Sequence, residues 1–303
     1  MSSITVEHIS KNYNGVAALD DISFDVKKGE LFGLIGPDGA GKTSLFKILV
    51  TLLLPSSGKA SVEGLDVQND FRKIRELVGY MPGKFSLYQD LSIEENLRFF
   101  ATVFKTTVQK NYDMIRDIYV QIEPFKKRRA GQLSGGMKQK LALCCALIHR
   151  PTVLFLDEPT TGVDAVSRKE FWDMLKSLKE HGISILVSTP YMDEAALCER
   201  IALIQHGKIL SVDTNDGIVA GFGKPLFAVK ASNTYRLLTD LRAFDATDSC
   251  FPFGDAVHWS TTRTDAGAEL LKNYLAAKEH EQVEVSRITP GIEDCFMDLM
   301  QKK

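Results

Sequence analysis

The sequence has no long apolar run. Its longest candidates among 303 residues are Leu52–Leu54, with the helix expected before it, and Leu141–Ile148. Both fall well short of the roughly 20 apolar residues that a transmembrane helix needs. Met1–Ser10 also lacks the basic start and apolar stretch of a signal peptide. We therefore expect a cytoplasmic protein that reaches a membrane only through a partner.

Net charge and cysteine are also scarce. With 37 Lys and Arg against 39 Asp and Glu, the formal net charge is -2, which argues against nucleic acid as a partner held by a broad basic surface. The five cysteines are an odd number and include the neighbours Cys144 and Cys145, so free thiols in a reducing compartment are favoured. Cys and His show no metal-ligand spacing, and the chain shows no internal repeat or low-complexity tract.

Strand and helix patterns alternate through the first two thirds of the chain. Leu31–Ile35 is a short apolar run followed by glycines, which is typical of a strand buried on both faces. A helix pattern runs from Lys42 to Leu54, and a further one covers Glu94–Phe104. The other strands that we expect are Ile4–His8, Leu19–Val26, Thr152–Leu156, Ile183–Ser188 and Ile201–Ile204. This alternation predicts an α/β fold with a mainly parallel sheet and helices on both faces.

The pattern changes after about Ile218. Gly221–Pro225 has the composition of a linker. The segments beyond it predict strands at Leu226–Lys230, Val257–Ser260 and Val283–Ile288, and helices at Asn233–Phe244, Asp265–His280 and Ile292–Gln301. We therefore expect a small C-terminal α+β domain.

A glycine-rich motif follows the buried strand and opens the next helix. It fits the pattern G-x-x-x-x-G-K-[ST] with the residues Gly36, Pro37, Asp38, Gly39, Ala40, Gly41, Lys42 and Thr43. Glycines allow backbone N–H groups to approach phosphate oxygens, and the helix N-terminus adds its positive end. Lys42 then reaches the β- and γ-phosphates, and the Thr43 hydroxyl ligates Mg²⁺. The alternative is a glycine-rich turn that merely begins a helix.

Two acids end a second buried strand. Asp157 and Glu158 follow the apolar run Thr152–Leu156, and carboxylates at such a position are costly unless a cation compensates their charge. We assign Asp157 to the shell of Mg²⁺ and Glu158 to the role of general base for an attacking water. The alternative is a strand end with solvated acids.

A third motif combines a helix N-cap with two glycines. Ser134 is a favourable N-cap residue, and bare glycines at a helix start allow close approach to an anion. The motif consists of Leu133, Ser134, Gly135, Gly136 and Met137. It predicts a second phosphate-binding surface, with an ordinary capped helix as the alternative.

These three motifs, in this order and at this spacing, resemble the ATP-binding cassette (ABC) family. The resemblance covers Ile4 to about Asp216 and implies a P-loop ABC cassette over residues 1–220. Such a cassette has a mainly parallel core sheet, an antiparallel β subdomain and a helical subdomain, here at about residues 84–148. Residues 225–303 would form the accessory α+β domain.

In that family two cassettes pair head to tail and enclose ATP between the phosphate loop of one and the signature of the other. The resemblance thus implies ATP and Mg²⁺ as ligands, ATP contacts from Gly36 through Ser44, and contacts of Leu133–Met137 with the ATP of a partner cassette. That partner is either a copy of this chain or a different cassette.

Two weaker matches belong to the same resemblance. Tyr13 lies where the family stacks an aromatic ring on adenine, although an ordinary surface tyrosine is the alternative. Asp164, in Gly162-Val163-Asp164, resembles the loop through which the two active sites communicate. A helix cap before Ser167–Lys176 is the alternative for Asp164.

At two positions the sequence departs from the family. Gly83 stands where the family usually has a Gln that helps to ligate Mg²⁺, and Pro190 stands where it usually has a His that contacts the γ-phosphate. Proline has neither an N–H nor a titratable group, so it cannot replace histidine. We expect binding to survive, and we expect this chain's own site to turn over slowly because positioning carries much of phosphoryl transfer.

The C-terminal segment Arg287–Leu299 resembles the closing motif of efflux-type cassettes, the drug and sodium exporters, whose ATPase is separate from the membrane subunit. A generic amphipathic helix is the alternative. Lys84–Leu91 mixes aromatic and polar residues, and we expect the permease to dock there. Core packing by Phe85 and Leu87 is the alternative for that segment.

The resemblance favours an ATPase subunit that energises a separate exporter permease at the inner face of the cell membrane. A non-transport cassette of the repair or translation type is a second reading. Repair cassettes carry long coiled-coil insertions and translation cassettes carry paired domains, and this sequence has neither feature. A regulatory cassette that closes on ATP and scarcely hydrolyses it is a third reading, which Gly83 and Pro190 keep open.

Overall fold

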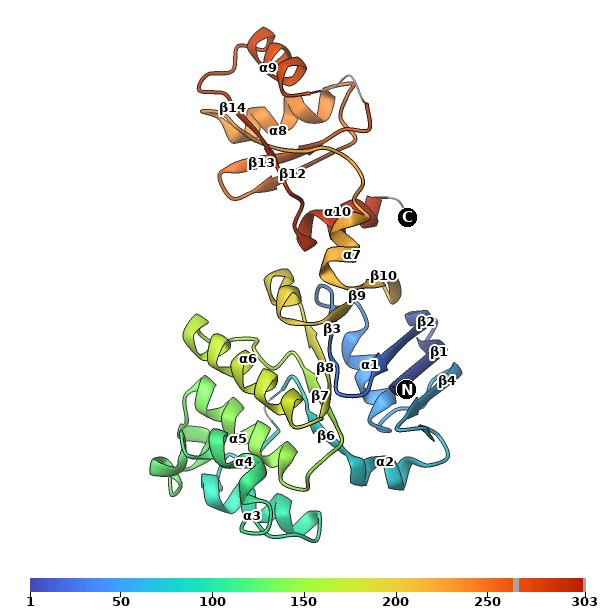
Figure 1. Ribbon diagram of the computed structural model, residues 1–303, viewed down its shortest axis with the longest axis vertical. Helices are drawn as coiled ribbons and strands as arrows, with labels where there is room; N and C mark the ends of the chain where they lie inside the picture. Colours follow the sequence, from blue (N-terminus) through green and yellow to red (C-terminus); the bar gives the residue numbers. More distant parts are fainter. Residues whose placement is uncertain (85, 264–266, 302–303) are drawn as a thin grey trace. The chain divides into compact units, whose positions relative to one another are not determined.

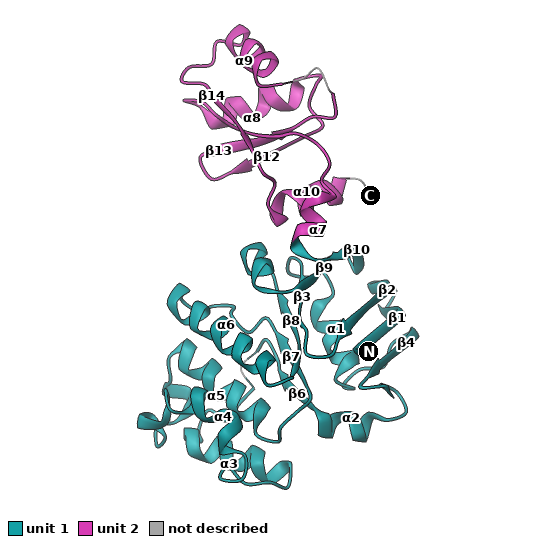
Figure 2. Cartoon of the chain, in the orientation of Figure 1, with its two compact units in different colours: residues 1–215 teal, residues 216–303 magenta. Residues whose placement is uncertain are grey.

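The computed structural model describes residues 1–84, 86–263 and 267–301. The chain divides into two compact units, Met1–Asn215 and Asp216–Lys303 (Figure 2). The division therefore lies a few residues before the linker at 221–225 on which the sequence analysis placed it. Within the described residues, no helix is long and apolar enough to cross a membrane.

The first unit is built on a mainly parallel sheet, as the alternating pattern predicted. Its strand order is β10-β9-β3-β8-β7-β6, and only β10 pairs antiparallel with its neighbour among these strands. The strands are β3 (Leu31–Ile35), β6 (Val78–Met81), β7 (Val153–Asp157), β8 (Ser184–Thr189), β9 (Arg200–Gln205) and β10 (Lys208–Asp213). Every residue of β3, β7 and β8 is buried, which explains their continuous apolar runs.

A second, antiparallel sheet lies beside the first and encloses α1 (Lys42–Leu49) between them (Figure 1). Its order is β2-β1-β4-β5, with β1 (Ser2–Tyr13), β2 (Val16–Lys27), β4 (Ser57–Val62) and β5 (Leu65–Asp66). Phe46 of α1 packs edge-on against Phe155 of β7, and the same core continues through Ile4 and Ile22 of the antiparallel sheet. Burial of α1 on both sides thus fixes the helix that follows the phosphate loop.

The expected helix from Lys42 to Leu54 is wrong at its end, because α1 stops at Leu49. Thr51 has a left-handed backbone, with φ 64°, and the amides of Leu52 and Leu53 both turn back to the carbonyl of Lys47. The apolar pattern suggested a longer helix because it continues through Leu52 and Leu54, but both of these leucines are exposed and lie beyond the end of α1.

Helices cover the other face and one end of the parallel sheet. Figure 1 shows α6 (Ala165–Glu180) and α1 on opposite sides of β7 and β8, as expected for helices on both faces. The remaining helices are α2 (Phe71–Leu77), α3 (Ile93–Val103), α4 (Tyr112–Tyr119) and α5 (Gly135–Leu147), with short 3₁₀ turns at Glu123–Phe125, Ala130–Gln132 and Met192–Leu197. A capping box between Ser92 and Glu95 begins α3. The helical part expected at about 84–148 therefore consists of α3, α4 and α5.

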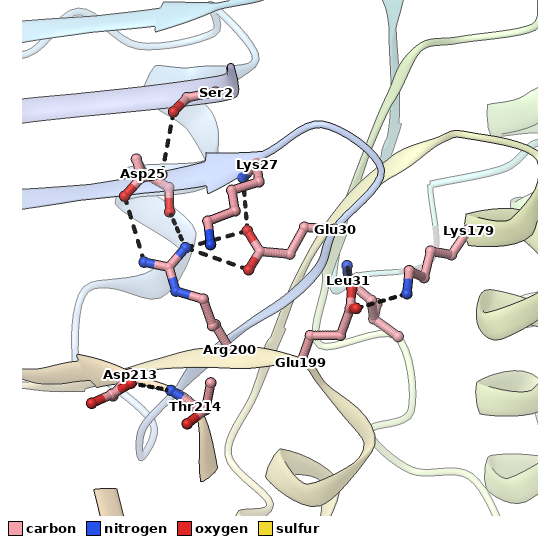
Figure 3. A network of polar contacts seen from close by, with 10 residues as sticks. All are labelled: Ser2, Asp25, Lys27, Glu30, Leu31, Lys179, Glu199, Arg200, Asp213 and Thr214. Carbon is pink, nitrogen blue, oxygen red and sulfur yellow. Dashed lines mark hydrogen bonds and ion pairs between the residues drawn. The ribbon is translucent and has the colours of Figure 1, made fainter. Parts of the chain in front are cut away.

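A cluster of charges joins the two sheets at the end opposite the phosphate loop (Figure 3). Arg200, at the start of β9, contacts Glu30 at 3.4 Å and Asp25 of β2 at 3.5 Å. Glu199 accepts the Leu31 amide at 3.0 Å and pairs with Lys179 of α6 at 2.7 Å. The amino ends of β3 and β9 are thus held to β2 and α6 by side chains, which leaves their carboxyl ends for the site.

The second unit has its own antiparallel sheet and core. The sheet order is β12-β13-β11-β14, and the chain follows the path β-α-β-β-α-β of a ferredoxin-like fold. Trp259 is fully buried there among Leu237, Leu241 and Leu271. The elements are α7 (Asn215–Ala220), β11 (Leu226–Lys230), α8 (Thr234–Ala243), β12 (Ser249–Phe253), β13 (Ala256–Ser260), α9 (Ala268–Ala277), β14 (Glu284–Ile288) and α10 (Ile292–Gln301).

Sequence expectation and structure agree at Leu226–Lys230 and Ile292–Gln301. The expected helix start at Asp265 lies outside the described residues, and α9 is described from Ala268. Strand β12 was not expected.

Candidate functional site

The phosphate loop and the acid pair meet at one edge of the parallel sheet. β8 lies between β3 and β7, and all three run parallel, so their carboxyl ends lie together. The amide of Gly36, after β3, donates to the carbonyl of Thr189 in β8 at 3.2 Å. Ser188 of β8 donates its hydroxyl to Asp157 of β7 at 2.7 Å. The end of β8 therefore connects the two motifs that the sequence predicted.

Two glycines are required by the shape of the phosphate loop. A Cβ atom at Gly36 would collide with the carbonyl oxygen of Ile204 in β9. Gly41 has φ 105°, which L side chains rarely adopt, and a Cβ there would lie 2.5 Å from the carbonyl oxygen of Ala18. Both positions thus need glycine because neighbouring backbone approaches the loop closely.

The Lys42 ammonium lies at the centre of the site. Its residue is only 3 % exposed, and Nζ donates to the carbonyl oxygens of Gly36 at 2.7 Å and Pro37 at 3.0 Å. Nζ also pairs with Oε1 of Glu158 at 2.9 Å. Three oxygens therefore hold the cation of the loop beside the carboxylate that the sequence analysis assigned as the base.

Asp157 is a buried acid with the chemistry of a magnesium ligand. It is 2 % exposed, and burial raises the pKa of its carboxyl group, while hydrogen bonds from Ser188 and Thr43 oppose that rise. A divalent cation would compensate this buried charge. Among the described residues, no group of three or more His, Cys, Asp or Glu forms a metal site by itself. Asp157 and Thr43 therefore fit Mg²⁺ that takes its other ligands from phosphates and water.

Glu158 has a strained backbone, with φ 49°. Its amide is held by the carbonyl of Ser188 at 3.1 Å and by the Ser188 hydroxyl at 3.0 Å. A left-handed residue of this kind costs on the order of 1 kcal/mol and persists where its surroundings impose it. The side chain is 22 % exposed, so its carboxylate is accessible to water while it stays beside Lys42.

Tyr13 lies next to the helix that begins at the phosphate loop. Its hydroxyl is 3.4 Å from the hydroxyl of Ser44, its ring is under the ammonium of Lys11, and the residue is 42 % exposed. The structure thus places the partly exposed Tyr13 beside Ser44 in the first turn of α1. Its stacking on a base stays a prediction.

The signature motif lies apart from the phosphate loop. Ser134 caps α5 by accepting the Met137 amide at 3.4 Å, as predicted, and Ser134 and Gly135 are exposed while Leu133 and Gly136 are buried. Figure 1 shows α5 and α1 on opposite sides of β7 and β8. The exposed serine and glycine therefore belong to a surface separate from the loop of the same chain.

Asp164 is the N-cap of α6. Its carboxylate accepts the amides of Val166 at 3.1 Å and Ser167 at 3.0 Å, and the hydrogen bond from Ser167 lowers the pKa of its carboxyl group. The helix-cap alternative therefore describes this side chain, and a role between two active sites stays a prediction.

Of the two departures from the family, Gly83 lies next to the acids and Pro190 directly follows β8. An ideal Cβ at Gly83 would stand 3.0 Å from the carbonyl oxygen of Asp157. A cavity of about 170 Å³ joins Gly83 and Glu158 to Gly135 and Gln139 of α5. Pro190 follows the end of β8 directly after Thr189. Both positions thus border the site at the places where the family usually has polar side chains.

Glu194 organises the surroundings of Pro190, and the sequence analysis missed it. This acid is 1 % exposed and accepts the hydroxyls of Thr160 at 2.8 Å and Thr189 at 2.5 Å. Arg168 of α6 pairs with it at 3.1 Å. The segments after β7 and β8 are thereby tied to α6. One acid among several in the segment 191–199 does not reveal from the sequence that it is the buried one.

The segment expected to meet a permease is only partly described, because Phe85 lies outside the described residues. Leu87 is buried, while Tyr88 is half exposed and packs edge-on against Phe99 of α3. The side chain of Asn96 holds the Tyr88 backbone through both its amide and its carbonyl. Core packing thus applies to Leu87, and docking by this segment stays a prediction.

Comparison with known proteins shows which family this chain resembles. Residues 19–161 match the sequence profile of the ABC transporter family. The chain is 42 % identical over 219 residues to the probable multidrug ABC transporter ATP-binding protein YbhF of Escherichia coli strain K12, covering 72 % of this chain and 38 % of YbhF. It thus spans well under half the length of that relative.

A second relative is matched over most of its length. Nod factor export ATP-binding protein I of Burkholderia pseudomallei strain 1710b is 38 % identical over 211 residues, which cover 69 % of each protein. A solved ATP-binding subunit of an ABC transporter superimposes with a TM-score of 0.67 at 27 % identity, over 73 % of this chain and 94 % of that one. The chain therefore has the P-loop ABC cassette fold, and it belongs to the family of ABC transporter ATP-binding proteins.

Proposed function

We propose that this chain binds ATP with Mg²⁺ and hydrolyses it to ADP and phosphate. The observation that carries the proposal is the convergence on Lys42, whose ammonium contacts two carbonyls of the phosphate loop and the carboxylate of Glu158. A triphosphate bound by the loop would have its terminal group beside a cation, a buried acid and a carboxylate accessible to water. That set of groups is what phosphoryl transfer to water requires.

Each residue has a distinct role in this proposal. Backbone amides of Gly39, Gly41 and Lys42 and the start of α1 bind the phosphates, and the Lys42 ammonium contacts the β- and γ-phosphates. Asp157 and Thr43 would hold Mg²⁺, which would supply positive charge beside the phosphates. Glu158 takes a proton from the attacking water. Tyr13 stacks on the base beside Ser44.

We further propose that hydrolysis energises a separate membrane permease of an exporter, with this chain on the cytoplasmic face. The names of YbhF, a probable multidrug transporter protein, and of Nod factor export ATP-binding protein I support export as the direction of transport. A cavity of about 380 Å³ lined by Pro82, Leu87, Phe100 and Phe104 adjoins the segment 84–91 and offers an apolar docking place for the permease. Co-purification of a permease from detergent-solubilised membranes tests this step.

The exposed Ser134 and Gly135 support a second cassette as a partner, either a copy of this chain or a different one. Their position at the start of α5 suits contact with the γ-phosphate of ATP on that partner. ATP would then close the pair and hydrolysis would open it.

A weakened catalytic site is a second candidate, and Gly83 and Pro190 favour it. Neither offers a polar side chain at the edge where Asp157 and Glu158 lie. On this proposal the chain binds ATP, turns it over slowly, and lends its signature to a more active partner. Its test is steady-state hydrolysis by the wild type and by the double variant Gly83→Gln, Pro190→His. A rise of tenfold or more supports a weakened site, and an unchanged rate excludes it.

Binding of Mg-ATP to purified chain tests the main proposal directly. Titration calorimetry of the wild type is compared with Lys42→Ala and with Lys47→Ala, an exposed lysine one turn further along α1. We expect Lys42→Ala to weaken binding by about 100-fold, since a charge-assisted contact contributes roughly 3 kcal/mol, and Lys47→Ala to bind normally. Wild-type protein that fails to bind, or unchanged binding by Lys42→Ala, rules the proposal out.

A further inference from the structure

The turn between β9 and β10 contacts the phosphate loop through backbone atoms. It consists of His206 and Gly207, which have φ 47° and 74° and connect the paired residues Gln205 and Lys208. Positive φ at both central residues defines a two-residue turn of type I′. The amide of Gly207 donates to the carbonyl of Ala40 at 3.0 Å. A residue of the phosphate loop is thus bound by a turn more than 160 positions further along the chain.

The same turn is also bound to β2. The carbonyl of Gly207 accepts the amide of Asp20 at 2.8 Å, so both polar backbone groups of this residue are occupied. A Cβ at Gly207 would stand 2.7 Å from the carbonyl oxygen of Ala18, and a Cβ at Gly41 would stand 2.5 Å from that same oxygen. The Ala18 carbonyl therefore lies between the glycine of the turn and a glycine of the loop, and three segments meet there without room for a side chain.

β9 supports the other end of the loop. The carbonyl of Ile204, one residue before Gln205, occupies the space that a Cβ at Gly36 would need. The hairpin of β9 and β10 thus contacts the phosphate loop at Gly36 through its strand and at Ala40 through its turn. Because the loop presents backbone amides to phosphate, its grip depends on where those backbone atoms lie.

We propose that Gly207 is a positioning residue for nucleotide binding, acting through its hydrogen bond to Ala40. This inference rests on the proposed function, since it concerns how firmly the same loop holds phosphate. It also connects β10, the strand that leads into the second unit, to the nucleotide site, because the turn that precedes β10 contacts the phosphate loop. The residue acts on the loop backbone and does not touch the substrate.

The test compares two alanine substitutions at glycines with nearly the same backbone. Gly64, in the turn between β4 and β5, has φ 75°, and a Cβ there would meet nothing within 4 Å. Gly207→Ala and Gly64→Ala therefore carry the same left-handed strain, and only the former disturbs the contact with Ala18 and Ala40. We expect Gly207→Ala to raise the Kd for Mg-ADP on the order of tenfold or more, with Gly64→Ala within twofold of wild type.

Kinetics separate positioning from general destabilisation. The ATP KM of Gly207→Ala should rise with its Kd while kcat at saturating ATP changes less, because the hydrogen bonds of Gly207 join it to Ala40 and Asp20 and not to Asp157 or Glu158. If the folded Gly207→Ala binds Mg-ADP as Gly64→Ala does, the inference is wrong. Wild-type protein that binds no nucleotide contradicts the proposed function instead, and this inference with it.

Hydrogen exchange in the full wild-type chain decides the matter if Gly207→Ala fails to fold. Mg-ADP should slow exchange of the Gly207 and Asp20 amides together with the amides of the phosphate loop, since loop and turn share one hydrogen-bonded junction. The amide of Gly64 should not change. Protection that rises in the loop while the Gly207 and Asp20 amides stay unchanged overturns the proposal.

Discussion

At the scale of single residues, the candidate site contains an ion pair between Lys42 and Glu158. Lys42 and Glu158 are 2.9 Å apart in a partly buried setting, and the remaining contacts of the Lys42 ammonium at Gly36 and Pro37 are neutral carbonyls. A phosphate that binds Lys42 competes with Glu158 for the same cation. The proposed base and the proposed phosphate-binding cation would therefore influence each other, and charge removal at Glu158 should separate binding from chemistry.

We expect Glu158→Gln to bind Mg-ATP at least as tightly as the wild type and to hydrolyse it about 100-fold or more slowly. Binding keeps its strength because Gln no longer competes for Lys42, and hydrolysis falls because a general base contributes typically 10²–10⁴-fold. Calorimetry gives the affinity and phosphate release gives the rate. Glu170→Gln, at an exposed carboxylate on α6 paired with Lys140, is the matched control. Normal hydrolysis by Glu158→Gln would show that another group takes the proton.

Sequence motifs predicted those residues of the candidate site that belong to a short local pattern in the chain. Lys42 and Glu158 were proposed because a phosphate loop and an acid pair are local patterns. Glu194 and Gly207 were missed, since their partners Thr160 and Ala40 lie far away in the sequence. Their roles come from strand order, which brings the ends of β8 and β9 beside the loop.

At the scale of secondary-structure elements, α5 is held by side-chain contacts at both ends. Ser134 caps its start, and His149 follows its end. The His149 ring stacks on Phe104 at 3.7 Å, and its Nε2 lies 3.1 Å from the carbonyl of Val78, at the start of β6. Among the described residues, Nδ1 of this histidine is buried without a hydrogen-bond partner. The connection of α5 to β6 and to the end of α3 therefore depends on a neutral imidazole.

This connection should weaken in mild acid. Burial lowers the pKa of His149 below its ordinary 6.5, so between the two values the unfolded chain binds more protons, and stability falls as pH drops below about 6.5. His149→Gln should lose about 1 kcal/mol at pH 8 through the lost ring stacking and should show a shallower loss between pH 7 and 5. Urea unfolding across this range measures both effects. His181→Gln, at an exposed histidine after α6, should retain the wild-type slope, and a wild-type slope in His149→Gln would exclude the explanation.

Elements with one continuous pattern were predicted well, and interrupted ones were not. Leu31–Ile35 matched β3 because burial on both faces makes its run apolar throughout. β1 and β2 are longer than expected, since left-handed residues at His8 and Asp21 interrupt their alternation. β12, which was not expected, contains Pro252 and lies at the edge of its sheet, where a missing N–H is tolerated.

At the scale of the whole molecule, the chain has two units with separate cores. Trp172 of α6 is buried in the first unit and Trp259 in the second, and these are the two tryptophans of the sequence. The residues that we propose to bind nucleotide all belong to the first unit. The unfolding of each unit can therefore be followed by the fluorescence of its own tryptophan. A ligand that binds the first unit should shift the unfolding transition reported by Trp172.

Thermal unfolding should then separate the units. In Trp259→Phe the remaining Trp172 reports the first unit, and in Trp172→Phe the remaining Trp259 reports the second. Mg-ADP at 100 times its Kd stabilises the form that binds it by about 2.7 kcal/mol, which for a unit of this size corresponds to roughly 5–10 °C in Tm. We expect that shift at Trp172 and a change of less than about 2 °C at Trp259, because the second unit has its own fully internal core. Equal shifts at both tryptophans would mean that the units unfold as one cooperative body, and would extend the influence of bound nucleotide to the C-terminal sheet.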